Sequence, residues 1–182
     1  MTAPFFTVGH SNRSLEDFVR LLKDAGVEQV ADIRTIPKSR ANPQFNGAAL
    51  AATLPADGIG YDLIAELGGL RGKARTVPAA VNGFWTNDSF HNYADYALSE
   101  RFQAGLVRLI AEGRVRPTAM MCAEAVWWRC HRRIVSDYLI ARGETVLHIM
   151  AEGRLEPARL TPGARVREDG TVVYPPAEPP AR

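Results

Sequence analysis

The chain has 182 residues, which is the size of one ordinary globular domain and too short for two full ones. Hydrophobic residues make up 46% and charged residues 23%, so the composition excludes a disordered, collagen-like or coiled-coil protein. Its apolar runs are shorter than the roughly 20 residues that span a bilayer, and its first residues lack the features of a signal peptide. We therefore expect a cytoplasmic protein with no membrane partner.

Cysteine content and charge distribution bear on function. The only cysteines, Cys122 and Cys130, are too few for a disulfide scaffold and suit a reducing compartment. The net charge of +2 gives no global sign of nucleic-acid binding. Nine basic residues instead fall in three segments without acidic residues, at 34–46, 71–84 and 125–136. Positive charge is therefore concentrated in three short stretches.

The start of the chain predicts a strand, a helix and a second strand. Residues 4–8 form a short apolar run that ends at Gly9, as a buried strand does. Ser14 opens a capping-box pattern, apolar residues recur at helical spacing, and Gly26 ends the helix. A second strand then ends at Asp32. Two strands around one helix predict a βαβ unit with parallel pairing and a right-handed crossover.

The rest of the chain alternates helices and strands. Strands are predicted near 60–63 and at 118–123 and 145–150, and helices at 47–54, 88–112 with a break near Ser99, and 130–143. The glycine-rich segment 67–84 is interpreted as a long functional loop. We expect one α/β domain at 1–150, with a three-layer, mostly parallel, Rossmann-like sheet flanked by helices. Residues 151–182 are expected to form a C-terminal extension with a small hairpin turning at Asp169-Gly170 and a Pro-rich tail.

Polar, titratable side chains gather where the predicted strands end. Open parallel sheets bind ligands at the carboxyl ends of their strands, which meet along one edge. The side chains placed there are His10, Ser11, Asp32, Arg34, Cys122, Glu124 and, near the end of the fifth strand, His148. A histidine in an apolar strand, such as His148, is more often a core residue. The edge as a whole is the expected functional site.

These residues belong to motifs that resemble the domain of unknown function 488 family. The motifs, in chain order, are Gly9-His10-Ser11, Asp32-Ile33-Arg34, Pro37-x-Ser39, Leu67-Gly68-Gly69, Met121-Cys122-Ala123-Glu124, Cys130-His131-Arg132-Arg133 and His148-Ile149-Met150. The resemblance runs from about Thr7 to Met150, and segment 160–165 is also similar to the family. It implies an α/β fold and a polar site built from these motifs, and it supplies no established reaction.

Anion binding explains more of the candidate residues than any other chemistry. Guanidinium groups suit phosphate or carboxylate, glycines 68–69 let backbone N–H groups approach an anion, and a helix beginning near residue 130 attracts one. The candidate ligand-holding residues are Ser11, Arg34, Ser39, Asn46, Trp127, Arg129, His131 and Arg132. Nucleobases stack on aromatic rings, and the rings near the basic segments are Phe45, Phe84, Trp85, Trp127 and Trp128. Salt bridges for the arginines and core packing for the rings are the alternatives.

The two cysteines admit three interpretations. A helix N-terminus with nearby arginines favours a thiolate at Cys130, which would be a nucleophile or a redox thiol. Both cysteines could instead be packing residues. Zinc could bind Cys122, Cys130, His10 and His131, but their spacing is not that of a metal motif and the arginines oppose a cation. We therefore predict no metal site, and the sequence points to no particular cofactor.

The leading hypothesis is an enzyme acting on a phosphate-bearing nucleotide or nucleic-acid substrate. Glu124, His10 or Asp32 would move a proton, and Cys122 or Cys130 would be a nucleophile or support the loop. A non-catalytic module that binds a nucleotide or nucleic acid is the alternative, and a thiol-redox or metal-binding protein is a lesser one. The expected partner is a phosphate-bearing small molecule or nucleic acid, and a homo-oligomer is left open.

Overall fold

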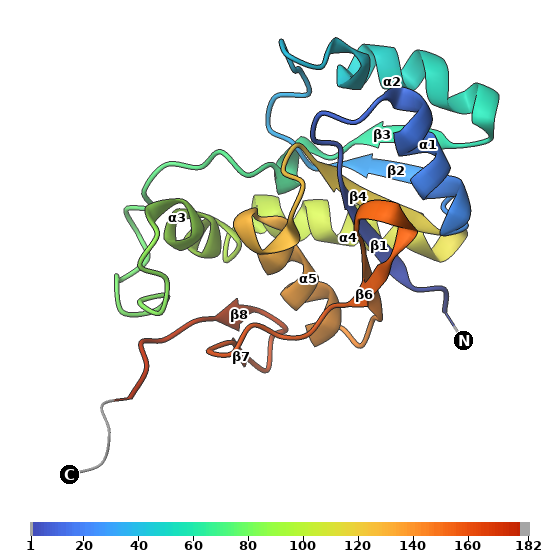
Figure 1. Cartoon of the computed structure of the whole chain (residues 1–182). Coiled ribbons are helices and arrows are strands. Elements are labelled where there is room, and N and C mark those ends of the chain that lie inside the picture. The colour runs from blue at the N-terminus through green and yellow to red at the C-terminus, as the bar shows by residue number, and fades with distance from the viewer. Residues whose placement is uncertain (1, 179–182) are drawn as a thin grey trace.

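The computed structural model describes residues 2–178 and shows an α/β fold around one six-stranded sheet (Figure 1). The strands run in the order β3-β2-β4-β1-β5-β6. They are β1 (Phe5–Gly9), β2 (Gln29–Asp32), β3 (Gly60–Leu63), β4 (Thr118–Cys122), β5 (Val146–Ile149) and β6 (Leu155–Pro157). The first five are parallel, and β6 pairs antiparallel with β5 at one edge. The predicted fold class is confirmed.

One detail of the predicted topology is wrong, because β1 and β2 are parallel but do not pair. Strand β4 lies between them and forms ladders with both. All five residues of β4 are buried, so this apolar strand occupies the centre of the sheet. The βαβ pattern of the first 32 residues carries no sign that a distant strand inserts there.

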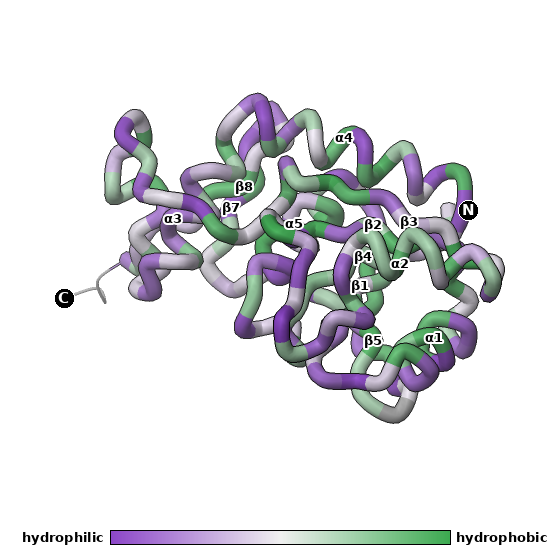
Figure 2. The backbone as a smooth tube through the Cα atoms, turned by 90° about the horizontal axis from the view of Figure 1, so that it is seen from above, coloured by the Kyte–Doolittle hydropathy of each residue, from purple (hydrophilic) through white to green (hydrophobic). Residues whose placement is uncertain are grey.

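Five α-helices flank the sheet, and sequence capping signals mark several of their ends. They are α1 (Leu15–Asp24), α2 (Gly47–Thr53), α3 (Asp88–Tyr96), α4 (Glu100–Val115) and α5 (Arg132–Ala141). The hydroxyl of Ser14 accepts a hydrogen bond from the Asp17 N–H and caps α1. The Ser99 hydroxyl caps α4 in the same way and confirms the predicted break between α3 and α4. Hydrophilic and hydrophobic residues alternate along α1 and α4, as Figure 2 shows.

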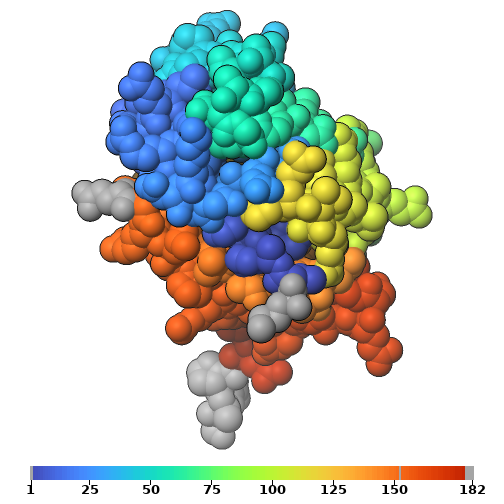
Figure 3. Space-filling model, turned by 90° about the vertical axis from the view of Figure 1, so that its right-hand side faces the viewer, coloured from blue at the N-terminus to red at the C-terminus, as the bar shows by residue number. Residues whose placement is uncertain are grey.

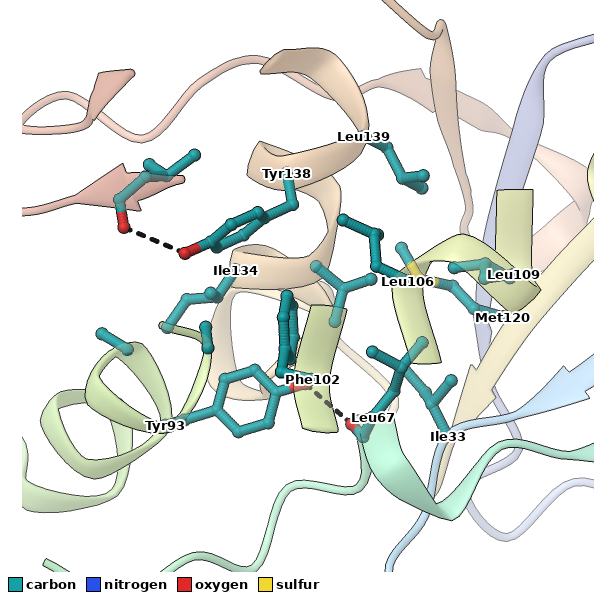
Figure 4. Packing of buried hydrophobic residues seen from close by; sticks show 14 of the residues in the cluster. Ile33, Leu67, Tyr93, Phe102, Leu106, Leu109, Met120, Ile134, Tyr138 and Leu139 are labelled. Atoms are coloured by element: carbon teal, nitrogen blue, oxygen red, sulfur yellow. Dashed lines mark hydrogen bonds between the residues drawn. The ribbon is translucent and has the colours of Figure 1, made fainter. Parts of the chain in front are cut away.

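Two clusters of buried residues lie on the two faces of the sheet and give it three layers. Phe6 and Val8 of β1 pack with Phe18 of α1 and Leu50 of α2. The opposite cluster contains Phe5 of β1 and residues of α3, α4 and α5, part of which appears in Figure 4. In that cluster the Tyr93 hydroxyl donates to the Leu67 carbonyl, at 2.7 Å. Neighbouring β1 residues point to opposite faces, so both layers are fixed by one strand.

The C-terminal segment packs back onto the α5 side of the molecule. The predicted hairpin is present as β7 (Arg165–Val166) and β8 (Val172–Val173), and its turn contains Gly170 at φ +84°. Tyr174 is fully buried and its hydroxyl donates to Asp137 of α5, at 2.7 Å. Residues 179–182 of the predicted Pro-rich tail lie outside the described residues.

Figure 3 shows the start of the chain in dark blue, between the segment that links α4 to β4 in yellow and the C-terminal part in orange.

Among residues 2–178, none of the helices has both the length and the apolar character needed to cross a bilayer.

Candidate functional site

A cavity of about 440 Å³ opens at the carboxyl edge of the sheet, as expected for a parallel α/β fold. Its walls come from the chain after β2, the loop after β3, the start of α3, and the loop that joins β4 to α5. The sequence-predicted residues that line it are Arg34, Cys122, Glu124, Arg129, Cys130 and His131. Three of the predicted catalytic residues, Cys122, Cys130 and Glu124, therefore line one cavity.

The two cysteines lie in contact in this cavity. Cys122 ends β4, Cys130 precedes α5, and the loop between them folds back until the two Sγ atoms are 3.0 Å apart. Both are free thiols. The Cys122 side chain is buried, while Cys130 is partly buried. Two cysteines that are eight positions apart in the sequence are therefore in direct sulfur–sulfur contact.

Arg132, the first residue of α5, holds the Cys130 sulfur in place. Its Nε donates to Cys130 Sγ at 3.2 Å and its backbone N–H donates to the same sulfur at 3.3 Å. Its other two nitrogens donate to the Thr7 hydroxyl at 3.0 Å and the Glu124 carbonyl at 2.8 Å. The side chain is only 1% exposed and its donors contact the protein itself, whereas the sequence suggested a ligand contact for Arg132. The anion that Arg132 binds is the sulfur of its own chain.

The surroundings of the two sulfurs shift their pKa values in opposite directions. Burial opposes a charged sulfur, but hydrogen bonding to Cys122 and the adjacent His131 and Arg132 hold the pKa of the Cys130 thiol well below its ordinary value. Burial and the neighbouring Cys130 sulfur raise the pKa of the Cys122 thiol well above its ordinary value. We therefore assign Cys122 as the donor and the Cys130 thiolate as the acceptor of the 3.0 Å contact.

His131 forms a second wall of the cavity and is held at both sides. Its Nε2 donates to the carbonyl oxygen of Ile33, at 2.6 Å. Gly69 lies against the other side of the ring, where a Cβ atom would be 2.5 Å from Nδ1. Gly68 approaches Thr35 equally closely, with a virtual Cβ 2.3 Å from its hydroxyl oxygen. The glycine pair that the sequence suggested for anion binding therefore lets this loop close against His131 and Thr35.

Asp32, His10 and Arg34 form a buried network beside the cavity. Arg34 donates to both carboxylate oxygens of Asp32, at 2.9 and 2.7 Å, and the Tyr61 hydroxyl donates to Asp32 at 2.5 Å. His10 donates from Nδ1 to the Ser11 carbonyl at 2.8 Å, and its Nε2 accepts from Arg34 at 3.3 Å. Burial lowers the pKa of His10, which stays neutral here. Asp32 and His10, which the sequence suggested for proton transfer, are therefore both buried and hydrogen-bonded within the protein.

The remaining predicted site residues shape loops around the edge of the sheet. Asn46 accepts a hydrogen bond from the Ser39 N–H at 2.7 Å, which fixes the loop before α2. Ser11 has a positive φ of 49°, and its hydroxyl donates to Asn12 at 3.4 Å. Trp127 stacks on His148, with ring centroids 4.6 Å apart and planes 5° apart. Within the described residues, none of these side chains lines the cavity, in contrast to the sequence-based expectation.

Two of the aromatic rings proposed for base stacking belong to the core. Phe45 is fully buried and stacks on His10 at 4.5 Å, and Trp85 is 7% exposed and stacks on Phe90 at 4.7 Å. Their nearness to basic residues along the chain does not indicate that they are accessible to a base. Trp128, at 43% exposed, is the ring that is open to solvent.

Sequence reasoning missed several residues that line the cavity. Lys38 lies in a basic segment, but nothing in the sequence distinguishes it from the nearby Arg40, which does not line the cavity. Ile36 and Leu70 are large apolar residues at the cavity, 58% and 72% exposed, and Phe90 of α3 lies in the wall. Exposed apolar side chains in loops have no periodic signal. They give the cavity apolar lining in addition to its cationic residues.

Among residues 2–178, no group of three or more His, Cys, Asp or Glu side chains is arranged to hold a metal ion. The cysteine pair and His131 are accompanied by arginines, and the Cys130 sulfur already accepts hydrogen bonds from Arg132.

The family model described as Domain of unknown function DUF488 matches residues 14–139. The matched segment runs from the cap of α1 to α5 and includes both cysteines, Glu124 and Arg132. No curated protein and no solved structure matches the chain.

Proposed function

Because that match spans more than half of the chain, the chain belongs to the domain of unknown function 488 family, and we propose that it is an enzyme whose Cys130 thiolate attacks a phosphate-bearing nucleotide. The observation that carries the proposal is the Cys130 sulfur, which lies at a cavity and accepts two hydrogen bonds from the buried Arg132. A buried arginine that contacts a neutral thiol has no negative charge to offset its loss of hydration, which would destabilise the fold. A charged thiolate supplies that negative charge. A charged, cavity-lining sulfur is a nucleophile.

The charges of the cavity support a phosphate group on the substrate. Arg34, Lys38 and Arg129 all line it, and the carboxylate of Glu124 is its one acidic lining residue among the described residues. Arg34 is paired with Asp32, so Lys38 and Arg129, which are both exposed, are the cations free to meet a phosphate. A volume of about 440 Å³ suits a small molecule rather than a long strand. Of the two substrate classes, the geometry favours a mononucleotide.

The apolar side of the cavity supports a flat base next to the phosphate. Ile36, Leu70 and Phe90 are large apolar residues in the lining, and the first two are largely exposed. Such a surface is covered when a planar ring binds, and burying it is favourable by roughly 25 cal/mol per Å² of apolar area. The phosphate would then lie toward Lys38 and Arg129.

The proposed reaction is a substitution in two steps. The Cys130 sulfur forms a bond to an electrophilic centre of the nucleotide, and the bond to the leaving group breaks with its electron pair. Water then attacks the same centre, releases the Cys130 thiolate and gives one proton to the departed group. Glu124 is an exposed residue that lines the cavity, and we propose that its carboxyl carries that proton.

Binding is tested first with inorganic phosphate, mononucleotides and short single-stranded DNA and RNA, by thermal shift at several salt concentrations. Lys38→Ala is expected to weaken mononucleotide binding about tenfold, by the loss of one charge-assisted contact. Arg40→Ala is the matched control, because Arg40 is exposed in the same basic segment and does not line the cavity. Equal losses in both variants contradict a phosphate at this site.

Catalysis is tested with Cys130→Ala on whichever mononucleotide binds. We expect this variant to keep binding and lose all turnover, with product followed by chromatography and a covalent adduct sought on the wild-type chain by intact mass. Binding without turnover in both proteins would instead identify a binding module. Binding of oligonucleotides alone, falling steeply with salt, would assign that module to nucleic acid.

A further inference from the structure

We propose that Cys122 and Cys130 form a reversible disulfide, with Cys130 oxidised by a hydroperoxide and Cys122 closing the bond. The proposal concerns the two sulfur atoms alone and requires no bound nucleotide. It therefore goes beyond the proposed function and can stand or fall separately from it.

Contact between the sulfurs is the first support. The Sγ atoms are 3.0 Å apart, and Cys130 lines the cavity, where a small oxidant can meet its sulfur. A disulfide bond is about 2 Å long, so closing it requires a movement of about 1 Å. These are the only cysteines in the sequence, which leaves each sulfur one intramolecular partner.

The surroundings of the sulfurs divide the two roles. Cys130 accepts hydrogen bonds from Arg132 at 3.2 and 3.3 Å and is less deeply buried than Cys122, which suits the sulfur that attacks a peroxide. Cys122 is 2% exposed and its Sγ donates either to Cys130 or to the Glu124 carbonyl at 3.6 Å. Cys122 is therefore shielded from the first oxidation and well placed for the second step.

The first step transfers oxygen to Cys130. Its thiolate attacks the terminal oxygen of the hydroperoxide, the O–O bond breaks, and a sulfenic acid forms on Cys130 while the alkoxide takes a proton from water. The sulfur has then lost two electrons to the peroxide.

The second step closes the disulfide. Cys122 gives up its proton and attacks the Cys130 sulfur, the S–O bond breaks, and the leaving hydroxide takes that proton to become water. Two thiols and one hydroperoxide thus give one disulfide, one alcohol and one water.

Arg132 makes this disulfide easy to reduce. In the reduced state the buried guanidinium faces the Cys130 thiolate, and in the disulfide that negative charge is gone. A buried cation without its counter-charge destabilises the oxidised state, and a pair whose reduced form is stabilised is a stronger oxidant. Two molecules of a small thiol such as glutathione are expected to reopen the bond and leave as one disulfide.

The experiment uses the whole chain treated with one equivalent of hydrogen peroxide without ligand, then alkylated and weighed by intact mass. We expect the wild type to lose two hydrogens and both alkylation sites. Cys122→Ser is the matched variant that should stop at a sulfenic acid on Cys130, which dimedone traps. Cys130→Ser should leave Cys122 unmodified. Circular dichroism establishes that each variant is folded.

Two outcomes overturn the proposal. One is a wild-type chain that retains two alkylatable thiols, or acquires oxygen without losing two hydrogens. The other is a disulfide that stays closed in excess reduced glutathione under native conditions, which would make it structural. Mononucleotide binding to the reduced chain is measured in parallel, so that failure of the disulfide and failure of the proposed function are seen independently.

Discussion

Gly9 lies directly against the backbone of Glu124, where a Cβ atom on residue 9 would be 1.7 Å from the Glu124 carbonyl oxygen. The loop after β4 therefore crosses the end of β1 at a distance that only glycine allows. The same carbonyl accepts a hydrogen bond from Arg132 at 2.8 Å, so this crossing also supports the residue that holds the Cys130 sulfur. The first residue of the Gly9-His10-Ser11 motif thus has a steric role at the site.

We predict that Gly9→Ala destabilises the chain by about 3 kcal/mol or more, because two backbone segments must separate to admit the methyl group. Thermal denaturation followed by circular dichroism measures the effect. Gly72→Ala is the control, since a Cβ there has no neighbour within 4 Å and its φ is not in the left-handed region. Similar melting temperatures for the two variants would show that the loop moves aside at little cost.

The ion pair between Asp32 and Arg34 gives a second prediction. Both side chains are buried, and Asp32→Asn leaves the Arg34 guanidinium uncompensated. We expect a loss of about 3–5 kcal/mol in urea denaturation. The control is Asp57→Asn, which breaks an exposed contact with Lys23 and should cost less than about 1 kcal/mol. An equally small loss for Asp32→Asn would mean that water or another group replaces the carboxylate.

The elements that sequence could predict are those with a periodic pattern or a cap. Strand β4 is an apolar run, Ser14 caps its helix as the spacing suggested, and a helix begins at the break predicted near Ser99. Strand β6 was missed because its three residues, Leu155–Pro157, are largely exposed and show no apolar run. Its pairing with β5 is a tertiary contact that local pattern does not encode.

For the candidate site, the sequence predicted which residues gather at the edge of the sheet better than it predicted their contacts. Ends of neighbouring parallel strands meet by geometry, so the edge of the sheet could be identified. Arg132 and Phe45 were predicted to contact a ligand because a sequence shows charge and aromatic character but does not show burial. In the structure Arg132 is 1% exposed and Phe45 is 0% exposed. The contact between Cys122 and Cys130 depends on how an irregular loop folds, for which the sequence holds no periodic signal.

His148 makes stability depend on pH. Burial, with the nearby Arg132 charge, lowers the pKa of His148 to about 4 from an ordinary 6.5. Between these pH values the unfolded chain binds a proton that the folded chain does not, so the free energy of unfolding falls as pH drops from 6.5 to about 4. The loss from this residue is on the order of 3 kcal/mol.

His148→Gln tests this dependence, because glutamine can still hydrogen-bond the Thr7 hydroxyl, which lies 2.7 Å from His148 Nδ1. Urea denaturation across the same pH range should show a shallower fall in the free energy of unfolding for the variant than for the wild type. The carboxylates that titrate there are common to both proteins and cancel in the difference. Parallel curves would mean that His148 in the folded chain has its ordinary pKa.

Arg132 controls the charge of Cys130, and Arg132→Gln should show it. The variant removes the cation that contacts the sulfur at 3.2 Å, so the pKa of the Cys130 thiol rises toward its ordinary value. Each unit of rise lowers the thiolate fraction about tenfold at pH below the pKa, and the rate of iodoacetamide alkylation falls with it. We expect the pH profile of alkylation to move to higher pH.

The matched control for this shift is Arg133→Gln. It removes the same charge from the next residue, whose Nε donates to the Thr161 hydroxyl at 3.1 Å instead of to a sulfur. Cys122→Ser is used as the background for both variants, so that Cys130 is the one thiol titrated. A profile that moves equally in both variants would show that overall charge, rather than the Arg132 contact, sets the reactivity of Cys130. A profile that moves only with Arg132→Gln ties the thiolate to the single guanidinium that the fold buries beside it.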